Sequence, residues 1–261
     1  MKHLDLFSGI GGFALAARWA GIETVAFCEK DAFCQKVLKK HWPDVPIYDD
    51  IKDFDGTQFT GIDLLTGGYP CQPFSLAGKR KGEEDDRHLW PEMLRVIEQA
   101  RPAFILSENV AGHVSMGLDD VLFDLESLGY AARPLIIPAC AVDADHRRDR
   151  VWIIAHAELH GRNEAKNARG TDESKEKSGV LEPEGCFSVP ERVWKGRPEH
   201  RKPNGLLSKT GLCRNDDGIP DRVDRVKSLG NAIVPQVAYA LINAIVMYNA
   251  LFRRPLPRTD D

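Results

Sequence analysis

The sequence predicts an α/β fold with a parallel sheet that carries helices on both faces. Over the first 156 residues, apolar strand-like runs alternate with helix-like segments. This alternation is typical of parallel sheets built from strand–helix–strand units. The apolar runs also lack strict two-residue alternation, which indicates strands that are buried on both sides.

The expected elements follow one another in chain order. Strands are expected at 4–7, 23–29, 62–68, 103–110, 133–142 and 150–157. Helices are expected at 12–20, 31–42, 89–100, 118–129 and 230–252. Pro91 can occupy the first turn of its helix, and Gly129 ends the next one. Pro235 lies near the start of the last helix.

Composition divides the chain into four parts. Residues 1–157 form the main α/β domain. Gly, Pro, Asn and charged residues cluster in residues 158–226, where apolar runs are few, so we expect a small irregular region there. Residues 227–252 return to the main domain as a helix, and residues 253–261 form a tail.

The bulk properties indicate a soluble globular protein. The chain has 261 residues, of which 43% are hydrophobic and 28% charged, as in ordinary globular proteins. No apolar run approaches the roughly 20 residues needed to cross a bilayer, and Asp5 interrupts the N-terminal run. We therefore expect a cytoplasmic protein without a membrane partner.

Cysteine spacing and charge indicate which kinds of site and partner to expect. None of the six cysteines has the spacing of a zinc knuckle, so we expect no metal and no disulfide framework. The net charge is −4, but Lys79, Arg80 and Lys81 form a basic cluster. Between positions 192 and 214, seven basic residues accompany one acidic residue. Such patches on an acidic chain indicate that one face meets a polyanion.

A glycine-rich turn, DLFSGIGGF at 5–13, lies between a strand and a helix. Glycines let the backbone approach a ligand at a helix N-terminus. Glu29 follows Gly9 by twenty residues, where this class of fold holds a carboxylate on a ribose diol. Asp50 and Ile51 follow the next loop. The pattern predicts a nucleotide-type cofactor, but its spacing does not distinguish NAD from S-adenosylmethionine.

A single cysteine, Cys71, lies between Pro70 and Gln72, with Pro73 close behind. Two prolines fix the backbone around this thiol. Cys71 also follows an apolar strand, at the carboxyl edge where α/β sheets bind their ligands. A thiol held there near positive charge can act as a nucleophile.

Two further strand ends carry reactive groups. Glu108 lies at the end of the strand 103–110, and Arg148 and Arg150 precede the apolar run VWIIA. A thiol, a carboxyl group and guanidinium groups beside a cofactor suit nucleophilic addition to an electron-poor ring. A protonated carboxyl group can donate to a ring nitrogen, while the arginines can hold a carbonyl oxygen or a phosphate.

Together and in this order, the motifs resemble those of the cytosine carbon-5 DNA methyltransferases. The matching stretches are DLFSGIGGF at 5–13, Glu29, Asp50-Ile51, PCQPFS at 70–75, ENV at 108–110, HRRDRVWII at 146–154 and GNAIVPQV at 230–237. They lie within residues 1–156 and 227–249. His146 stands where the family usually has glutamine, and Ala232 also departs from the common family residue.

The resemblance implies a Rossmann-like, S-adenosylmethionine-dependent methyltransferase sheet, with residues 1–157 as the catalytic and cofactor-binding domain. S-adenosylmethionine is the implied cofactor. The implied cofactor-binding residues are Phe7, Ser8, Gly9, Ile10, Gly11, Gly12, Glu29, Asp50, Ile51 and Asn231. The implied catalytic residues are Cys71, which attacks carbon 6 of cytosine, and Glu108, Arg148 and Arg150, which hold the base.

The implied partner is double-stranded DNA, from which the target cytosine must be flipped out. Residues 75–88 would close over the base, and the region 158–226 would read the target sequence. The implied substrate-binding residues are Tyr69, Pro70, Gln72, Ser75, Lys79, Arg80, Lys81, Trp194, Arg197, Arg201 and Lys202. We expect a monomer that serves restriction–modification beside a separate endonuclease, or a phage or orphan modification role.

Two alternatives stay open at this point. An enzyme of this architecture can act on cytosine in transfer RNA instead of DNA. A catalytically silent DNA-binding regulator can keep the fold, although the intact set of Cys71, Glu108 and Arg150 argues against it. A dehydrogenase with a cysteine nucleophile does not explain the PCQ and ENV motifs together.

Overall fold

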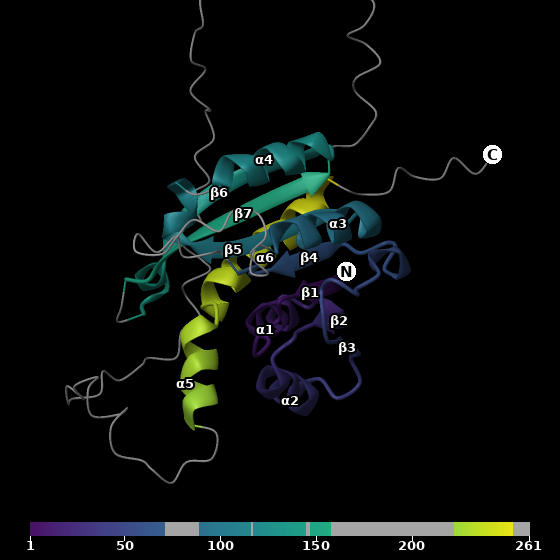
Figure 1. Cartoon of the computed structure of the whole chain (residues 1–261). Helices are drawn as coiled ribbons and strands as arrows, with labels where there is room; N and C mark the ends of the chain where they lie inside the picture. Colours follow the sequence, from purple (N-terminus) through teal and green to yellow (C-terminus); the bar gives the residue numbers. More distant parts are fainter. Residues whose placement is uncertain (71–88, 116, 145–146, 158–221, 253–261) are drawn as a thin grey trace, which may run out of the picture. The chain divides into compact units, whose positions relative to one another are not determined.

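The computed structural model describes residues 1–70, 89–115, 117–144, 147–157 and 222–252 (Figure 1). Within these residues, a seven-stranded sheet has the order β3-β2-β1-β4-β5-β7-β6. The strands are β1 (Lys2–Leu6), β2 (Glu23–Cys28), β3 (Ile47–Tyr48), β4 (Leu64–Gly67), β5 (Phe104–Val110), β6 (Tyr130–Pro138) and β7 (Asp149–Ala157).

The helices alternate with the strands as the sequence predicts. They are α1 (Gly12–Trp19), α2 (Ala32–His41), α3 (Trp90–Ala100), α4 (Leu118–Ser127), α5 (Arg222–Asn231) and α6 (Pro235–Phe252). Short 3₁₀ turns lie at η1 (Gly56–Gln58), η2 (Ala111–Ser115) and η3 (Ala139–Val142). Asp31 caps α2, because its carboxylate accepts from the amides of Phe33 and Cys34.

The prediction of a parallel sheet is correct for six strands, which run in one direction, and wrong for β7, which runs in the opposite direction. β3, β2, β1, β4 and β5 run parallel, whereas β7 is antiparallel to both β5 and β6. A parallel crossover takes a dozen or more residues, and only residues 139–148 connect β6 to β7. The strand expected at 133–142 begins at Tyr130 and ends at Pro138, where η3 follows.

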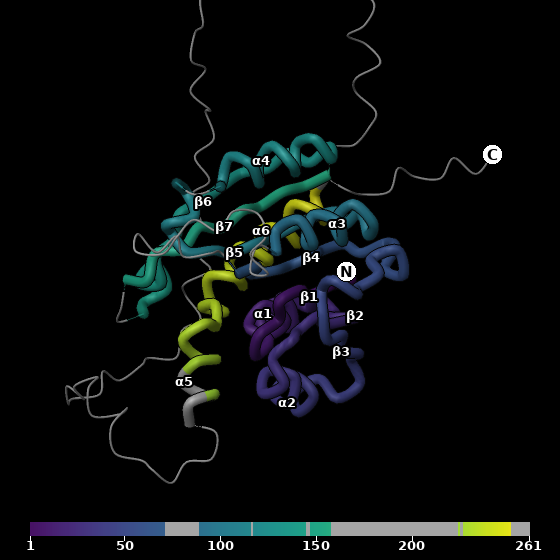
Figure 2. Tube along the Cα trace, viewed as in Figure 1, coloured from purple at the N-terminus to yellow at the C-terminus, as the bar shows by residue number. Residues whose placement is uncertain are grey.

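Each face of the sheet is covered by its own set of helices (Figure 2). Along β5, Ile105 packs with α3 and α4, whereas Phe104 and Leu106 pack with α1 and α6. The first and last helices, far apart in the sequence, meet directly, with the Trp19 and Tyr239 rings 6.1 Å apart. The central strands β1, β4 and β5 are therefore buried on both sides, as their unbroken apolar runs predict, whereas the middle of the edge strand β6 is exposed.

The C-terminal segment differs from the single helix expected over 230–252. α5 ends at Asn231, and a new helix, α6, begins at Pro235. Proline suits the first position of a helix because its missing amide has no partner there in any case. α5 starts at Arg222, inside the stretch expected to be irregular, and belongs to the same compact unit as residues 1–157. Among the described helices, none combines the length and apolar character required to span a bilayer.

A line of buried polar side chains crosses the middle of the sheet. His3 Nδ1 lies 2.9 Å from Thr24 Oγ1, and His3 Nε2 lies 2.7 Å from Thr66 Oγ1. Thr66 Oγ1 donates to Asp5 Oδ1 at 2.8 Å. Both ring nitrogens of His3 therefore have hydrogen-bond partners inside the sheet.

Burial shifts the pKa of both ionisable members of this line toward the uncharged form. It lowers the pKa of His3 to about 3. It also raises the pKa of the Asp5 carboxyl group well above its usual value, against the opposing effect of the Thr66 hydrogen bond. Asp5 Oδ2 finds no hydrogen-bond partner among the described residues.

The Asp5→Asn variant should lose a stabilisation that the wild type gains at low pH. Because the folded pKa of Asp5 is raised, the wild type gains stability as the pH falls through that folded pKa toward the ordinary value of 3.8. Asparagine does not titrate, so over that range the variant should lose up to about 1.4 kcal/mol per pH unit relative to wild type.

Urea unfolding at pH 7, 6 and 5 measures this loss. Asp53→Asn, at an exposed carboxylate, is the control for removing one negative charge. Parallel pH profiles for Asp5→Asn and wild type would show that burial does not raise the pKa of Asp5.

Candidate active site

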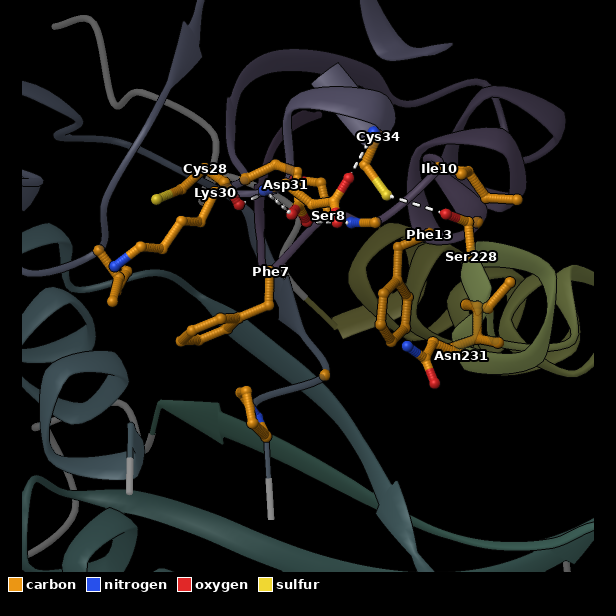
Figure 3. A pocket seen from close by; sticks show the side chains of 18 of the residues that line it. Phe7, Ser8, Ile10, Phe13, Cys28, Lys30, Asp31, Cys34, Ser228 and Asn231 are labelled. Atoms are coloured by element: carbon orange, nitrogen blue, oxygen red, sulfur yellow. Dashed lines mark hydrogen bonds between the residues drawn. The ribbon is translucent and has the colours of Figure 1, made fainter. Parts of the chain in front are cut away.

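A cavity of about 470 Å³ opens at the carboxyl ends of β1, β2 and β4 (Figure 3). Nine of the ten residues expected to bind a cofactor line it, namely Phe7, Ser8, Gly9, Ile10, Gly12, Glu29, Asp50, Ile51 and Asn231. Gly11 lines an adjoining cavity of about 480 Å³ instead. Gly68, Pro70 and Glu108 also line the first cavity. One hollow therefore joins the expected cofactor residues to the expected catalytic carboxyl group.

Glu29 ties the glycine-rich turn to the second strand. Its carboxylate accepts from the amide of Gly9 at 2.6 Å and from the amide of Asp31 at 2.7 Å. Burial raises the pKa of Glu29, and these two backbone bonds oppose the rise. The spacing of twenty residues between Gly9 and Glu29 thus corresponds to a direct contact.

The turn itself is built from backbone in the left-handed region. Gly9 has φ 54° and Gly11 has φ 85°, conformations that glycine adopts without strain. A Cβ on Gly11 would lie 2.7 Å from the ring of Trp42, whereas one on Gly9 would meet nothing within 4 Å. Phe7 has φ 53°, which costs on the order of 1 kcal/mol for a side chain of its size. This strained conformation carries the Phe7 ring into the cavity (Figure 3).

The residues around the cavity fit a nucleoside-type cofactor. The volume lies within the range of small-molecule sites, roughly 300–1,000 Å³. The Phe7 ring and buried Ile51 offer apolar surface to a planar base. Glu29 and Asp50 offer carboxylate oxygens that accept from hydroxyl or amino groups.

Glu108 and Arg150 form an ion pair at the far end of the cavity. β5 and β7 are antiparallel with Val110 opposite Arg150, so the end of one strand meets the start of the other. Arg150 Nε lies 2.8 Å from Glu108 Oε1, and 11% of the Glu108 side chain is exposed. Burial raises the pKa of Glu108, although the charges of Arg150 and Arg148 oppose this. A buried carboxyl group with a raised pKa is a candidate proton donor to a ring nitrogen.

Arg148 lies near this pair but makes its hydrogen bonds elsewhere. Its Nη2 donates to the carbonyl oxygens of Gly230 at 2.7 Å and of Ala232 at 3.1 Å. These acceptors belong to the C-terminal segment, and the expectation that Arg148 orients a base beside Arg150 stays a prediction. Its partners lie more than eighty residues away in the sequence, so no local pattern could have indicated them.

Tyr69, one of the residues expected to bind substrate, is buried, with 3% of its surface exposed. Its hydroxyl lies 2.8 Å from Nε2 of buried His113, and its backbone carbonyl accepts from Asn109 Nδ2 at 3.2 Å. Tyr69 thus anchors the end of β4 to β5 and η2, immediately before Pro70. His113 lies outside every motif identified in the sequence, so its contact with Tyr69 was not predicted.

Other predicted residues lie outside the described part of the chain. They are Cys71, Gln72, Ser75, Lys79, Arg80, Lys81, His146, Trp194, Arg197, Arg201 and Lys202. Their roles stay predictions. Among the residues that are described, no group of three or more His, Cys, Asp or Glu side chains is placed to hold a metal ion.

Comparison with known proteins gives consistent matches. The family described as C-5 cytosine-specific DNA methylase matches residues 1–209. Type II methyltransferase M.DsaV of Dactylococcopsis salina is 29% identical over 210 residues, which are 77% of this chain and 60% of the relative. Type II methyltransferase M.PspPI of Psychrobacter sp. (strain TA137) is 39% identical over 159 residues, 58% of this chain and 38% of the relative. The chain thus spans about half the length of these relatives.

Solved structures agree on the fold. The crystal structure of S. pombe Dnmt2 methyltransferase has a TM-score of 0.54 and 25% identity, covering 62% of this chain and 52% of that one. A putative DNA modification methyltransferase encoded within an E. coli prophage has a TM-score of 0.52 and 25% identity, covering 60% and 47%. The mixed sheet is therefore the Rossmann-like sheet of these methyltransferases.

Arg150→Ala should destabilise the protein more at high pH than at low pH. Without the guanidinium group, the pKa of buried Glu108 rises further, and a raised folded pKa makes stability fall as the pH rises above about 4.5. We expect a loss of about 3 kcal/mol at pH 8 and a smaller loss at pH 5, measured by urea unfolding. Adding Glu108→Gln should recover most of the loss at pH 8. An equal loss at both pH values would contradict the buried charge.

Proposed function

The chain belongs to the C-5 cytosine-specific DNA methylase family, and we propose that it methylates carbon 5 of cytosine in double-stranded DNA, using S-adenosylmethionine. The observation that carries the proposal is the single cavity with Glu29 near one end and the Glu108–Arg150 pair at the other. A nucleoside cofactor and a target base can meet there.

Phe7, Glu29, Asp50 and Ile51 would hold the cofactor. Phe7 and Ile51 would pack against the adenine, while Glu29 would accept from the ribose hydroxyls through lone pairs that Gly9 and Asp31 leave available. Acidic side chains also favour a cation over a neutral product in the same cavity. When bound, S-adenosylmethionine supplies an electrophilic methyl group.

Glu108 and Arg150 would hold the flipped cytosine. Protonated Glu108 would donate to ring nitrogen 3 and accept from the exocyclic amine, while Arg150 would keep the carboxyl group oriented. The Cys71 thiolate would add to carbon 6, which makes carbon 5 nucleophilic. After methylation, loss of the carbon 5 proton and of the Cys71 thiolate would restore the ring.

Residues 158–226 would form the part that reads the DNA sequence. Their basic run around Trp194 suits phosphate and base contacts. The modification would serve restriction–modification beside a separate endonuclease, or a phage or orphan role, and we propose that the protein acts as a monomer.

Bisulfite sequencing of DNA from a methylation-free bacterial host tests the reaction. Expression of the wild-type protein should protect cytosines in one recurring sequence context, because 5-methylcytosine resists conversion. Cys71→Ser should abolish protection, since a hydroxyl group is a far weaker nucleophile than a thiolate. Full protection with Cys71→Ser would refute the covalent mechanism. Protected cytosines in host transfer RNA, with none in DNA, would establish the RNA alternative.

Exchange of residues 158–226 with the corresponding segment of an active relative tests the recognition region. The hybrid should methylate the sequence context of the donor, because the catalytic groups of residues 1–157 stay unchanged. The same bisulfite assay measures this. A hybrid that keeps the original context would show that specificity lies elsewhere.

A further inference from the structure

Arg148 combines strained backbone with two long-range hydrogen bonds. Its φ of 36° lies in the left-handed region, which a side chain of this size rarely adopts. Strain of this kind persists where surrounding contacts require it. The conformation places the guanidinium group on the carbonyl oxygens of Gly230 and Ala232, in the link between α5 and α6.

The last residues of α5 and the first residues of the link to α6, which we together call the strap (residues 227–233), form one wall of the cofactor cavity. Lys227, Ser228, Asn231, Ala232 and Ile233 all line that cavity. Ser228 and Asn231 are seen beside it in Figure 3. A strap that moves outward would therefore open the cavity on this side.

The other contacts of the strap with the main domain are an exposed ion pair, a weak hydrogen bond and apolar packing. Lys227 pairs with Asp31 at 3.1 Å, but 61% of the lysine side chain is exposed, and exposed pairs contribute little. Ser228 Oγ lies 3.5 Å from Cys34 Sγ, a weak hydrogen bond. Ile233 packs on Gly12, and a Cβ added to Gly12 would lie only 2.6 Å from Cγ1 of Ile233. Charge-assisted bonds from Arg148 are the strongest polar contacts among these.

Arg148 also stands directly beside the base end of the site. It precedes β7, whose second residue, Arg150, pairs with Glu108 at 2.8 Å. The sheet therefore holds the backbone of Arg148, while the strap supplies the carbonyl oxygens that its side chain contacts. Burial lowers the pKa of Arg148, and the nearby charge of Arg150 adds to this effect. Because the two guanidinium groups repel each other, binding to separate acceptors lowers their electrostatic energy.

We propose that Arg148 is a positioning residue that fastens the strap over the cofactor cavity and links that wall to the base-binding strand. The identity of the ligand rests on the proposed function, whereas the fastening itself does not. Arg148 is thereby assigned to cofactor retention through Gly230 and Ala232, which flank the cavity-lining Asn231, and not to contact with the base. The fork of the guanidinium group suits two carbonyl acceptors, which an ammonium group serves less well.

Hydrogen exchange of the ligand-free protein tests the fastening without any cofactor. In Arg148→Ala, amides in residues 229–237 should exchange at least about tenfold faster than in wild type, because the bonds to a charged group are lost. Arg148→Lys should give an intermediate rate. Arg147→Ala is the matched control: it removes the same charge one residue away, from a side chain that is 82% exposed and pairs with Asp149. Equal exchange in Arg148→Ala and Arg147→Ala would overturn the proposal.

Titration with S-adenosylmethionine then tests the consequence. The dissociation constant should rise at least about fivefold in Arg148→Ala and stay at the wild-type value in Arg147→Ala. In steady-state assays, the loss should fall on KM for the cofactor more than on kcat. A loss confined to kcat, with unchanged cofactor affinity, would assign Arg148 to the base and overturn the proposal. Absence of binding by the wild type would refute the proposed function, while the exchange result would still decide the role of Arg148.

Discussion

Arg150 reaches Glu108 because β7 enters the sheet antiparallel to β5, and the architecture of the site depends on this reversal. The parallel strands β1, β2, β4 and β5 bring their carboxyl ends to one edge. A parallel β7 would start at the opposite edge, roughly 20 Å away. Antiparallel pairing instead places its first residues beside the end of β5. A base site can therefore adjoin a cofactor site that the parallel strands have already built.

The sequence was sufficient for features that depend on local chemistry. Apolar runs predicted the buried strands, and glycines predicted where a turn must adopt left-handed backbone. The twenty-residue interval from Gly9 to Glu29 predicted proximity, and the structure has a 2.6 Å hydrogen bond there. The motif resemblance is confirmed at the level of the family. Contacts between residues of neighbouring strand–turn–helix units can thus be predicted from the sequence alone.

Features that depend on distant partners were not predictable. An apolar run does not encode strand direction, so the sequence could not separate a parallel β7 from an antiparallel one. Pro235 indicates the start of a helix, but the amphipathic pattern that continues across it led to the expectation of one longer helix. Arg148 resembles Arg150 in the sequence, yet their acceptors lie on different segments of the chain. His113 gave no local indication of its contact with Tyr69.

The packing of α6 against α1 also bears on how the protein is made. Val237, Ala238, Ile242 and Ile245 complete the core on one face of the sheet, which includes Phe13 and Trp152. During translation these four side chains leave the ribosome long after the strands they cover. One face of a nearly finished sheet must therefore wait, apolar and exposed, until α6 arrives. Until then, this apolar face is the part of the growing chain at which aggregation or chaperone binding is favoured.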